Sequence, residues 1–287
     1  MRQAGRSTAA AVPAFASVKI AFIGGGNMAS ALIGGLLKKG YAAADLSVVE
    51  IDADARERLM ARFDVLSNTT AAAETSDSDV VLLAVKPQQL RAAAEGVRPL
   101  LHAQLVISIA AGVRSAELSR WLGGYQRIVR AMPNTPALVL AGASVLYALA
   151  SVTSAQRSVA EGILAAVGST LWVEREELMD AVTAVSGSGP AYVFYFIEAL
   201  EQAGRELGLA PADARQLSLD TFFGAVRLAR EGGEEPAVLR ARVTSKGGTT
   251  ERALRSMEAD RVRALIVEAV RQAAERSREL GDELARD

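Results

Sequence analysis

The chain has 287 residues, 50% of them apolar and 23% charged, so it is long enough for two globular domains. Its net charge of -1 includes no long run of one sign, so we expect neither nucleic acid nor a membrane as a partner. The absence of cysteine excludes disulfides, thiolate nucleophiles and cysteine-ligated metals, and is compatible with a reducing, cytoplasmic location.

The first sixteen residues, MRQAGRSTAAAVPAFA, combine two arginines, an alanine-rich stretch and an A-x-A triplet, as a secretory signal does. The apolar part is short, however, and Pro13 interrupts it. We therefore expect residues 1–16 to form a disordered tail rather than a signal.

Short β-rich runs alternate with helical patterns over residues 17–177. The predicted strands are residues 18–23, 46–50, 80–85, 105–109, 127–131 and 169–173. The predicted helices are residues 27–39, 53–62, 88–97 and 115–122. Apolar strands such as VVLLAV that alternate with helices are typical of a parallel sheet covered on both faces. The sequence thus predicts an α/β fold with a Rossmann-like dinucleotide-binding domain over residues 17–177.

A glycine-rich turn, GGGNMASALIGG, follows the first predicted strand and opens the first helix. Gly24, Gly26 and Ala29 occupy the positions of a G-x-G-x-x-A motif. Gly24 permits a tight turn, Gly26 lets the main chain approach a pyrophosphate, and Ala29 lets the helix lie close to the strand. This context predicts a dinucleotide site at the helix N-terminus; a glycine turn in an unliganded domain is the alternative.

An acidic residue, Glu50, closes the second predicted strand. An acid at this position hydrogen-bonds the adenosine ribose 2′-hydroxyl of NAD and repels the extra phosphate of NADP, so by itself Glu50 favours NAD. Arg56 and Arg58 follow a few residues later and could instead pair with that phosphate. These residues alone leave the cofactor choice open.

After residue 177 the chain shows only helical patterns, at residues 191–207, 212–231 and 261–284. We expect an all-helical domain over residues 178–287. Its helices have wide apolar faces, of which Phe222, Phe223 and Val226 are one example. Such faces pack either against a second subunit or against each other, and periodicity does not distinguish the two.

The segment VTSKGGTTERAL places two glycines before two threonines at a predicted helix start. Gly247 and Gly248 can expose consecutive main-chain N–H groups there, which suits a carboxylate. The hydroxyl of Thr250 would then face a substrate nitrogen. An ordinary capped helix start is the alternative.

Histidine is scarce, which bears on the chemistry. A carbonyl reductase needs an acid for the developing alkoxide, and the single histidine, His102, lies in a peripheral loop. A carbonyl substrate with a histidine acid is therefore disfavoured. An imine can be protonated before hydride arrives, so its reduction requires orientation more than proton transfer.

Six blocks occur in order along the chain: AFIGGGNMASALIGGL, LLAVKPQ, VISIAAGV, RAMPNTPA, AVSGSGPAYVF and VTSKGGTTERAL. Together they resemble the pyrroline-5-carboxylate reductase family, from about Val18 to the C-terminus. The resemblance implies an oxidoreductase of proline biosynthesis that reduces 1-pyrroline-5-carboxylate to L-proline, with NADPH as cofactor and NADH as the alternative. It also implies a helical C-terminal dimerisation domain, a homodimer or larger assembly, and an active site where domains of different subunits meet.

The resemblance and the motifs assign site residues. The predicted substrate-binding residues are Ser245, Gly247, Gly248, Thr249 and Thr250. Thr250, which would contact the ring nitrogen, and Lys86 are the predicted catalytic residues. The predicted cofactor-binding residues are Ile23, Gly24, Gly26, Asn27, Met28, Glu50, Asn68, Val85, Lys86, Pro87, Ala110 and Asn134. No metal ligand is predicted.

Two positions depart from the family pattern. Lys246 stands where the family often has proline, and we expect its ammonium to face solvent rather than the carboxylate. Glu50 stands where a small polar residue is frequent, which conflicts with the NADPH preference of many members. Lys86 is either a proton donor or a contact to cofactor phosphate or ribose. The alternative functions are a related enzyme of the same class that acts on another cyclic imine or on a β-hydroxy acid, and a dinucleotide-binding regulator without turnover.

Overall fold

The computed structural model describes residues 18–286, and the predicted tail, residues 1–16, lies outside them. The described chain divides into two compact units. The first unit consists of two segments, one that ends at Gly187 and one that begins at Glu275. The second unit is Ser188–Ala274.

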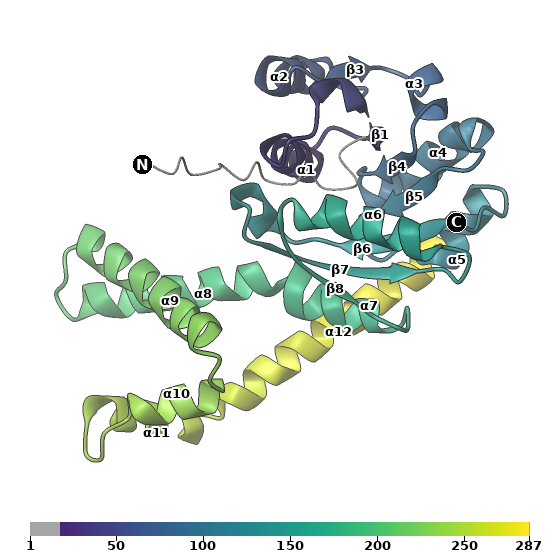
Figure 1. Cartoon of the computed structure of the whole chain (residues 1–287). Coiled ribbons are helices and arrows are strands. Elements are labelled where there is room, and N and C mark those ends of the chain that lie inside the picture. Colours follow the sequence, from purple (N-terminus) through teal and green to yellow (C-terminus); the bar gives the residue numbers. More distant parts are fainter. Residues whose placement is uncertain (1–17, 287) are drawn as a thin grey trace, which may run out of the picture. The chain divides into compact units, whose positions relative to one another are not determined.

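Within the described residues, the first unit contains one eight-stranded sheet (Figure 1). Its strands are β1 (Ile20–Ile23), β2 (Leu46–Val49), β3 (Leu66–Asn68), β4 (Val80–Leu83), β5 (Leu105–Ser108), β6 (Ile128–Met132), β7 (Gly142–Ala148) and β8 (Gly168–Trp172). Their order in space is β3-β2-β1-β4-β5-β6-β7-β8. Neighbouring strands are parallel except β6 and β7. Because β4 pairs with β1 on the side opposite β2, the direction of winding reverses between β1 and β4.

Both faces of the central strands are covered by helices. Alternate residues of β1 point to opposite faces, so that Ile20 and Phe22 join one apolar cluster and Ile23 joins the other. The first cluster includes side chains of α1 (Asn27–Lys38), α2 (Ala53–Phe63) and α6 (Ser154–Ala165). The second includes side chains of α4 (Pro87–Val97) and α5 (Ser115–Trp121). The prediction of a doubly covered α/β sheet is confirmed.

The prediction of a parallel sheet is wrong for the last two strands, β7 and β8, which run opposite to the other six. β7 returns antiparallel to β6 after a short 3-10 turn, too soon for a helical crossover. The prediction lacks β7 altogether. It also lacks β3, which has three residues and starts with the exposed Leu66, and α6, although Thr153 and Gln156 form a capping box at its start. The remaining short elements of this unit are η1 (Ala43–Asp45), α3 (Ala73–Ser76), η2 (Arg98–Leu100), η3 (Thr135–Val139), α7 (Leu178–Val182) and a π-helical turn (Thr183–Gly187).

The C-terminal part of α12 (Val262–Arg286) packs within the first unit. The Oγ of Ser277 donates to Asp180 Oδ1 of α7 over 2.7 Å. Arg114, just before α5, forms an ion pair with Asp282 at 2.6 Å. Because of these contacts, residues 275–286 of α12 belong to the first compact unit. The other boundary between the units follows Gly187, whereas the predicted domain boundary is at residue 177. The roles predicted for residues 17–177 and 178–287 stay predictions.

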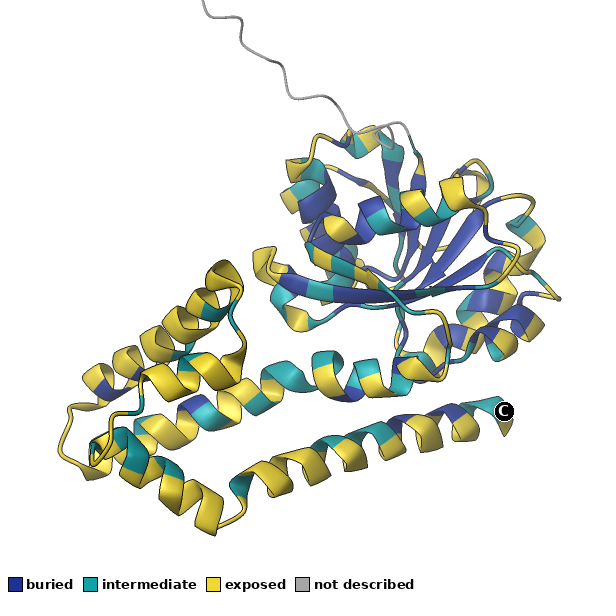
Figure 2. Ribbon diagram, turned by 60° about the horizontal axis from the view of Figure 1, so that its bottom comes forward, coloured by how far each residue is buried: buried dark blue, intermediate teal, exposed yellow. Residues whose placement is uncertain are grey.

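The second unit is helical, as predicted. It contains α8 (Gly189–Glu206), α9 (Pro211–Gly232), α10 (Pro236–Arg242), α11 (Thr249–Ala259) and the first part of α12. Among its described residues, the buried ones are Ile197, Ala214 and Ser218. Most residues of this unit are exposed (Figure 2). They include large apolar side chains such as Tyr195 and Phe223, each 70% exposed. An apolar surface of this extent is typical of a protein–protein interface.

In the part of the chain that the structure describes, no helix has the length and apolar character required to cross a membrane.

Candidate active site

A cleft of about 710 Å³ opens at the carboxyl ends of β1, β2 and β4 in the first unit. This is the point where the strand order reverses, and open α/β sheets bind their ligands at such points. The residues that follow the strands and line the cleft include Ile23, Gly24, Glu50, Thr69, Thr70, Val85 and Lys86, and α4 adds Gln88 and Gln89.

The glycine turn after β1 forms one wall of the cleft. Gly24 has φ of 101°, and a Cβ at this residue would lie 2.8 Å from the carbonyl oxygen of Ala84. At Gly26, by contrast, a Cβ would meet nothing within 4 Å, so the main chain is open on that side. Gly26 is the N-cap of α1, and no side chain caps this helix. The first-turn amides are therefore available to an anion, and the pyrophosphate of a dinucleotide fits this cradle.

The carboxylate of Glu50 is held beside this turn. Its Oε2 accepts a hydrogen bond from Gly25 N at 2.7 Å, and its Oε1 accepts one from Asp52 N at 2.9 Å. The main-chain N–H of Glu50 donates to the carbonyl oxygen of Asn68 at 2.9 Å. Asn68 thus contacts Glu50 through its main-chain carbonyl group. The side chain of Asn68 does not line the cleft.

The cleft brings together only part of the predicted cofactor set. The predicted residues that line it are Ile23, Gly24, Gly26, Glu50, Val85 and Lys86. Those that do not line it are Asn27, Met28, Asn68, Pro87, Ala110 and Asn134. Lys86, Ala110 and Asn134 follow β4, β5 and β6, which are parallel neighbours, so these residues lie at successive strand ends along one edge of the sheet. Thr69, Thr70, Gln88 and Gln89 line the cleft although they were not among the predicted cofactor-binding residues.

The side chain of Asn134 is bonded within the protein. Its Nδ2 donates to the carbonyl and hydroxyl oxygens of Ser186 at 3.2 and 3.3 Å. Its Oδ1 accepts from Ala143 N at 2.8 Å. Asn134 therefore connects the end of β6 to β7 and to the π-helical turn.

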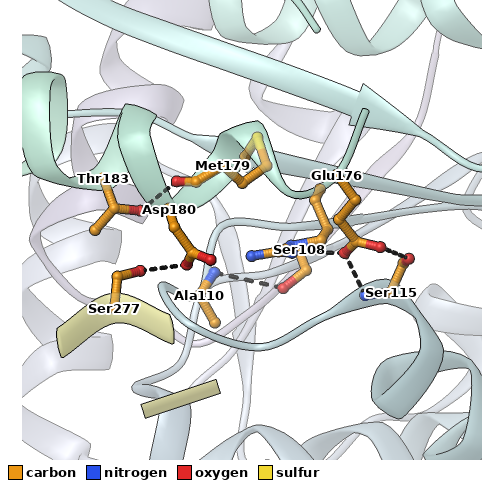
Figure 3. A network of polar contacts seen from close by, with 9 residues as sticks. Ser108, Ala110, Ser115, Glu176, Met179, Asp180, Thr183 and Ser277 are labelled. Atoms are coloured by element: carbon orange, nitrogen blue, oxygen red, sulfur yellow. Dashed lines mark hydrogen bonds and ion pairs between the residues drawn. The ribbon is translucent and has the colours of Figure 1, made fainter. Parts of the chain in front are cut away.

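A polar network that no sequence motif indicated lies close to the Ala110 segment (Figure 3). Glu176 forms an ion pair with Arg130 of β6 at 2.5 Å and accepts hydrogen bonds from the N–H and hydroxyl of Ser115 at 2.7 and 2.5 Å. Burial by itself would raise the pKa of Glu176, but the hydrogen bonds from Ser115 and Arg130 outweigh it and hold the pKa below its usual value. In the same view Ala110 N donates to Ser108 Oγ at 3.4 Å. Residues 115, 130 and 176 are distant in sequence, so only the fold reveals the network.

The predicted substrate loop of the second unit precedes α11. Gly247 has φ of 75°, which favours glycine, and a Cβ at Gly248 would lie 2.5 Å from Ser245 Oγ. Gly248 is the N-cap of α11, and no side chain caps this helix. The amides of Thr249 and Thr250 therefore begin a helix without a side-chain cap. The choice between a substrate site and an ordinary helix start stays a prediction.

Charged side chains surround this loop. Glu251 Oε2 accepts from Gly247 N at 2.6 Å, so this amide has an internal partner. Arg255 pairs with Glu251 at 3.1 Å, and Arg252 lines the same hollow of about 750 Å³. Two cations against one anion leave the hollow net positive, which suits a carboxylate ligand. Lys246 is exposed, as expected.

Among the described residues, no group of three His, Cys, Asp or Glu side chains could hold a metal ion.

Two family models match the chain. Residues 19–112 match the model for NADP oxidoreductase, coenzyme F420-dependent. Residues 176–280 match the model for pyrroline-5-carboxylate reductase dimerisation.

Known proteins resemble the chain over nearly its whole length. Pyrroline-5-carboxylate reductase of Pseudomonas aeruginosa is 46% identical over 267 residues, which are 93% of this chain and 98% of that protein. The structure of a pyrroline-5-carboxylate reductase from Coxiella burnetii has a TM-score of 0.87 at 40% identity, and the match covers 92% of this chain and 98% of that one. Pyrroline carboxylate reductase of Plasmodium falciparum, solved with NADP bound, has a TM-score of 0.83 at 29% identity over 92% of this chain and 98% of that one. The glycine-turn cleft, the loop before α11 and these full-length likenesses agree: the chain belongs to the pyrroline-5-carboxylate reductase family.

Proposed function

We propose that the chain reduces 1-pyrroline-5-carboxylate to L-proline, the last step of proline biosynthesis, with a reduced nicotinamide dinucleotide as hydride donor. The observation that carries this proposal is the uncapped start of α11 behind Gly247 and Gly248, in a chain whose other unit has a glycine-turn cleft. The full-length likeness to relatives named for this reaction supports it.

The loop before α11 would bind the substrate carboxylate. The amides of Thr249 and Thr250 donate to the carboxylate, Ser245 adds a hydroxyl, and Arg252 adds positive charge. Gly247 takes part only if Glu251 releases its amide. The Thr250 hydroxyl oxygen accepts a hydrogen bond from the protonated ring nitrogen and so orients the ring.

The first unit would bind the dinucleotide, which supplies the hydride. The amides of Asn27 and Met28 in the first turn of α1 receive the pyrophosphate, while Ile23 and Val85 line the cleft. When hydride reaches the imine carbon, the C=N bond becomes single and the nitrogen keeps the proton it already has, so the protein neutralises no alkoxide.

Along the same sheet edge, Lys86, Pro87, Ala110 and Asn134 would border the nicotinamide half of the cofactor, and Asn68 its adenosine half. Lys86 is exposed and is the N-cap of α4, which suits contact to a ribose or phosphate. Proton donation by Lys86 is the alternative. NADPH and NADH are both candidate donors, and a relative with NADP bound supports NADPH.

The second unit would pair with a second copy of the chain, giving a homodimer or a larger assembly. Its exposed apolar helices and the match of residues 176–280 to a dimerisation model support self-association. A cytoplasmic location belongs to the same proposal, and the absence of cysteine is compatible with it.

Oxidation of the reduced dinucleotide, followed with three kinds of substrate, tests the proposed reaction. We expect turnover with 1-pyrroline-5-carboxylate. Turnover only with another cyclic imine, or reduction of the oxidised dinucleotide by a β-hydroxy acid in the reverse assay, would assign a different substrate. Tight dinucleotide binding without turnover of any substrate would instead identify a regulator.

A further inference from the structure

The structure bears on the choice between NADH and NADPH, which differ by one phosphate on the adenosine ribose. In an open α/β fold that ribose lies at the end of the second strand, where Glu50 stands. Resting on the reductase function proposed above, we infer that Glu50 makes this chain prefer NADH to NADPH.

The Glu50 carboxylate is fixed in place and half-buried at the cleft. Hydrogen bonds from Gly25 N and Asp52 N hold one oxygen each, at 2.7 and 2.9 Å. A carboxylate offers about four acceptor positions, so about two stay available to the ribose hydroxyls. Space is restricted as well, since a Cβ at Gly25 would lie 3.3 Å from Glu50 Cβ. The carboxylate is thus held where it accepts a 2′-hydroxyl and repels a 2′-phosphate.

The nearest arginine is committed to the main chain. Both hydrogen bonds of Arg56 Nη1 go to carbonyl oxygens, those of Glu50 at 2.8 Å and Ile51 at 3.0 Å. Moving the Arg56 guanidinium away from these carbonyl oxygens toward a phosphate would break both bonds. Arg58 lies two residues further along α2, about 200° around the helix from Arg56, and is exposed.

The wall of the cleft offers little other positive charge at this end. Lys86 is the one cation among the described lining residues, and it follows β4, which β1 separates from β2. Thr69 and Thr70, which follow β3, are neutral and can bond to sugar hydroxyls as well as to phosphate. Electrostatics at the ribose end are therefore dominated by the Glu50 carboxylate.

The experiment compares the wild type with Glu50→Gln and Glu57→Gln. Glu57 is an exposed residue of α2 outside the cleft wall, so its replacement makes the same change in net charge without changing the site. For each protein, calorimetry gives the dissociation constants of NADH and NADPH, and an assay with 1-pyrroline-5-carboxylate gives kcat/KM for each.

We expect the wild type to bind NADH roughly tenfold more tightly than NADPH, and the kcat/KM values to follow the same order. Glu50→Gln should shift the ratio toward NADPH by about tenfold, and Glu57→Gln should leave it unchanged. The ratio is the readout because loss of a bond to Gly25 would weaken both dinucleotides alike. A wild-type preference for NADPH, or an unchanged ratio in Glu50→Gln, would overturn the inference. Failure of the proposed reaction would appear differently, as absent turnover with either dinucleotide while the binding ratio still reports on Glu50.

Discussion

The two compact units bury their apolar side chains in different ways. In the first unit, side chains such as Phe22 and Leu82 are completely buried between the sheet and its helices. In the second unit, Phe223 and Val226 of α9 are 70% and 63% exposed, although α9 is amphipathic, as α1 is. An apolar helix face therefore predicts that some other surface will cover it, but not which chain supplies that surface. In the first unit the same chain covers it, and in the second we expect a second chain to do so.

The largest effect is expected from breaking the buried ion pair of the first unit. Glu176→Ala leaves Arg130, whose side chain is 8% exposed, without its partner, which should lower the free energy of unfolding by about 3–5 kcal/mol. Urea unfolding measures the change. Glu177→Ala removes a neighbouring exposed carboxylate and should change stability by less than about 0.5 kcal/mol. Equal losses in the two variants would mean that the network does not support the fold.

A substitution on the apolar face of the second unit should weaken the association of two chains rather than the stability of the unit itself. Phe223→Glu places a charge on the exposed apolar face of α9 and should raise the dissociation constant of the dimer by about a hundredfold or more. Thr221→Glu adds the same charge at an exposed polar position about 200° around the helix and should have little effect. Sedimentation over a range of concentrations distinguishes them. An unchanged association of Phe223→Glu would show that this face is not the interface.

A substitution in the loop before α11 tests whether the second unit binds the substrate while the first unit binds the dinucleotide. Thr250→Ala should lower kcat by about ten- to a hundredfold, because it removes one oriented hydrogen bond at the reacting ring. Dinucleotide binding, which we assign to the first unit, should not change. Thr250→Ser keeps a hydroxyl and should retain most of the activity. Wild-type turnover in Thr250→Ala would remove the assignment of this loop.

The smallest expected effect is a pH dependence confined to the first unit. The pKa of Glu176 is lowered in the folded chain, so its contribution to stability is complete above the ordinary glutamate pKa of about 4.3. This contribution is lost as the pH falls through the lowered value. Urea midpoints measured from neutral pH down into this acid range should fall more steeply for the wild type than for Glu176→Gln. Parallel curves would show that Glu176 does not contribute.

Local features of the sequence were sufficient to predict part of the lining of the cleft in the first unit, whereas dinucleotide binding there stays a prediction. The turn at Gly24 and Gly26 depends on residues adjacent in the chain, and Glu50 follows from its place at the end of a strand. The helix start behind Gly248 is equally local. These are positions where backbone geometry and residue type determine each other.

Features that depend on contacts between distant segments could not be predicted in this way. β7 is defined by antiparallel pairing with β6, and β3 by pairing with β2, rather than by strong patterns of their own. The bonds of Glu176 to Ser115 and Arg130 join three segments. The packing of Ser277 on Asp180, which brings the end of α12 into the first unit, has no signal in the amphipathic pattern of that helix.

The most direct test of the central claim is a crystal structure of the chain with a dinucleotide and a proline analogue bound. We expect the carboxylate of the analogue to lie within hydrogen-bond distance of the main-chain amides of Thr249 and Thr250, and its ring nitrogen beside the Thr250 hydroxyl. An analogue bound away from the start of α11 would contradict the proposed mechanism.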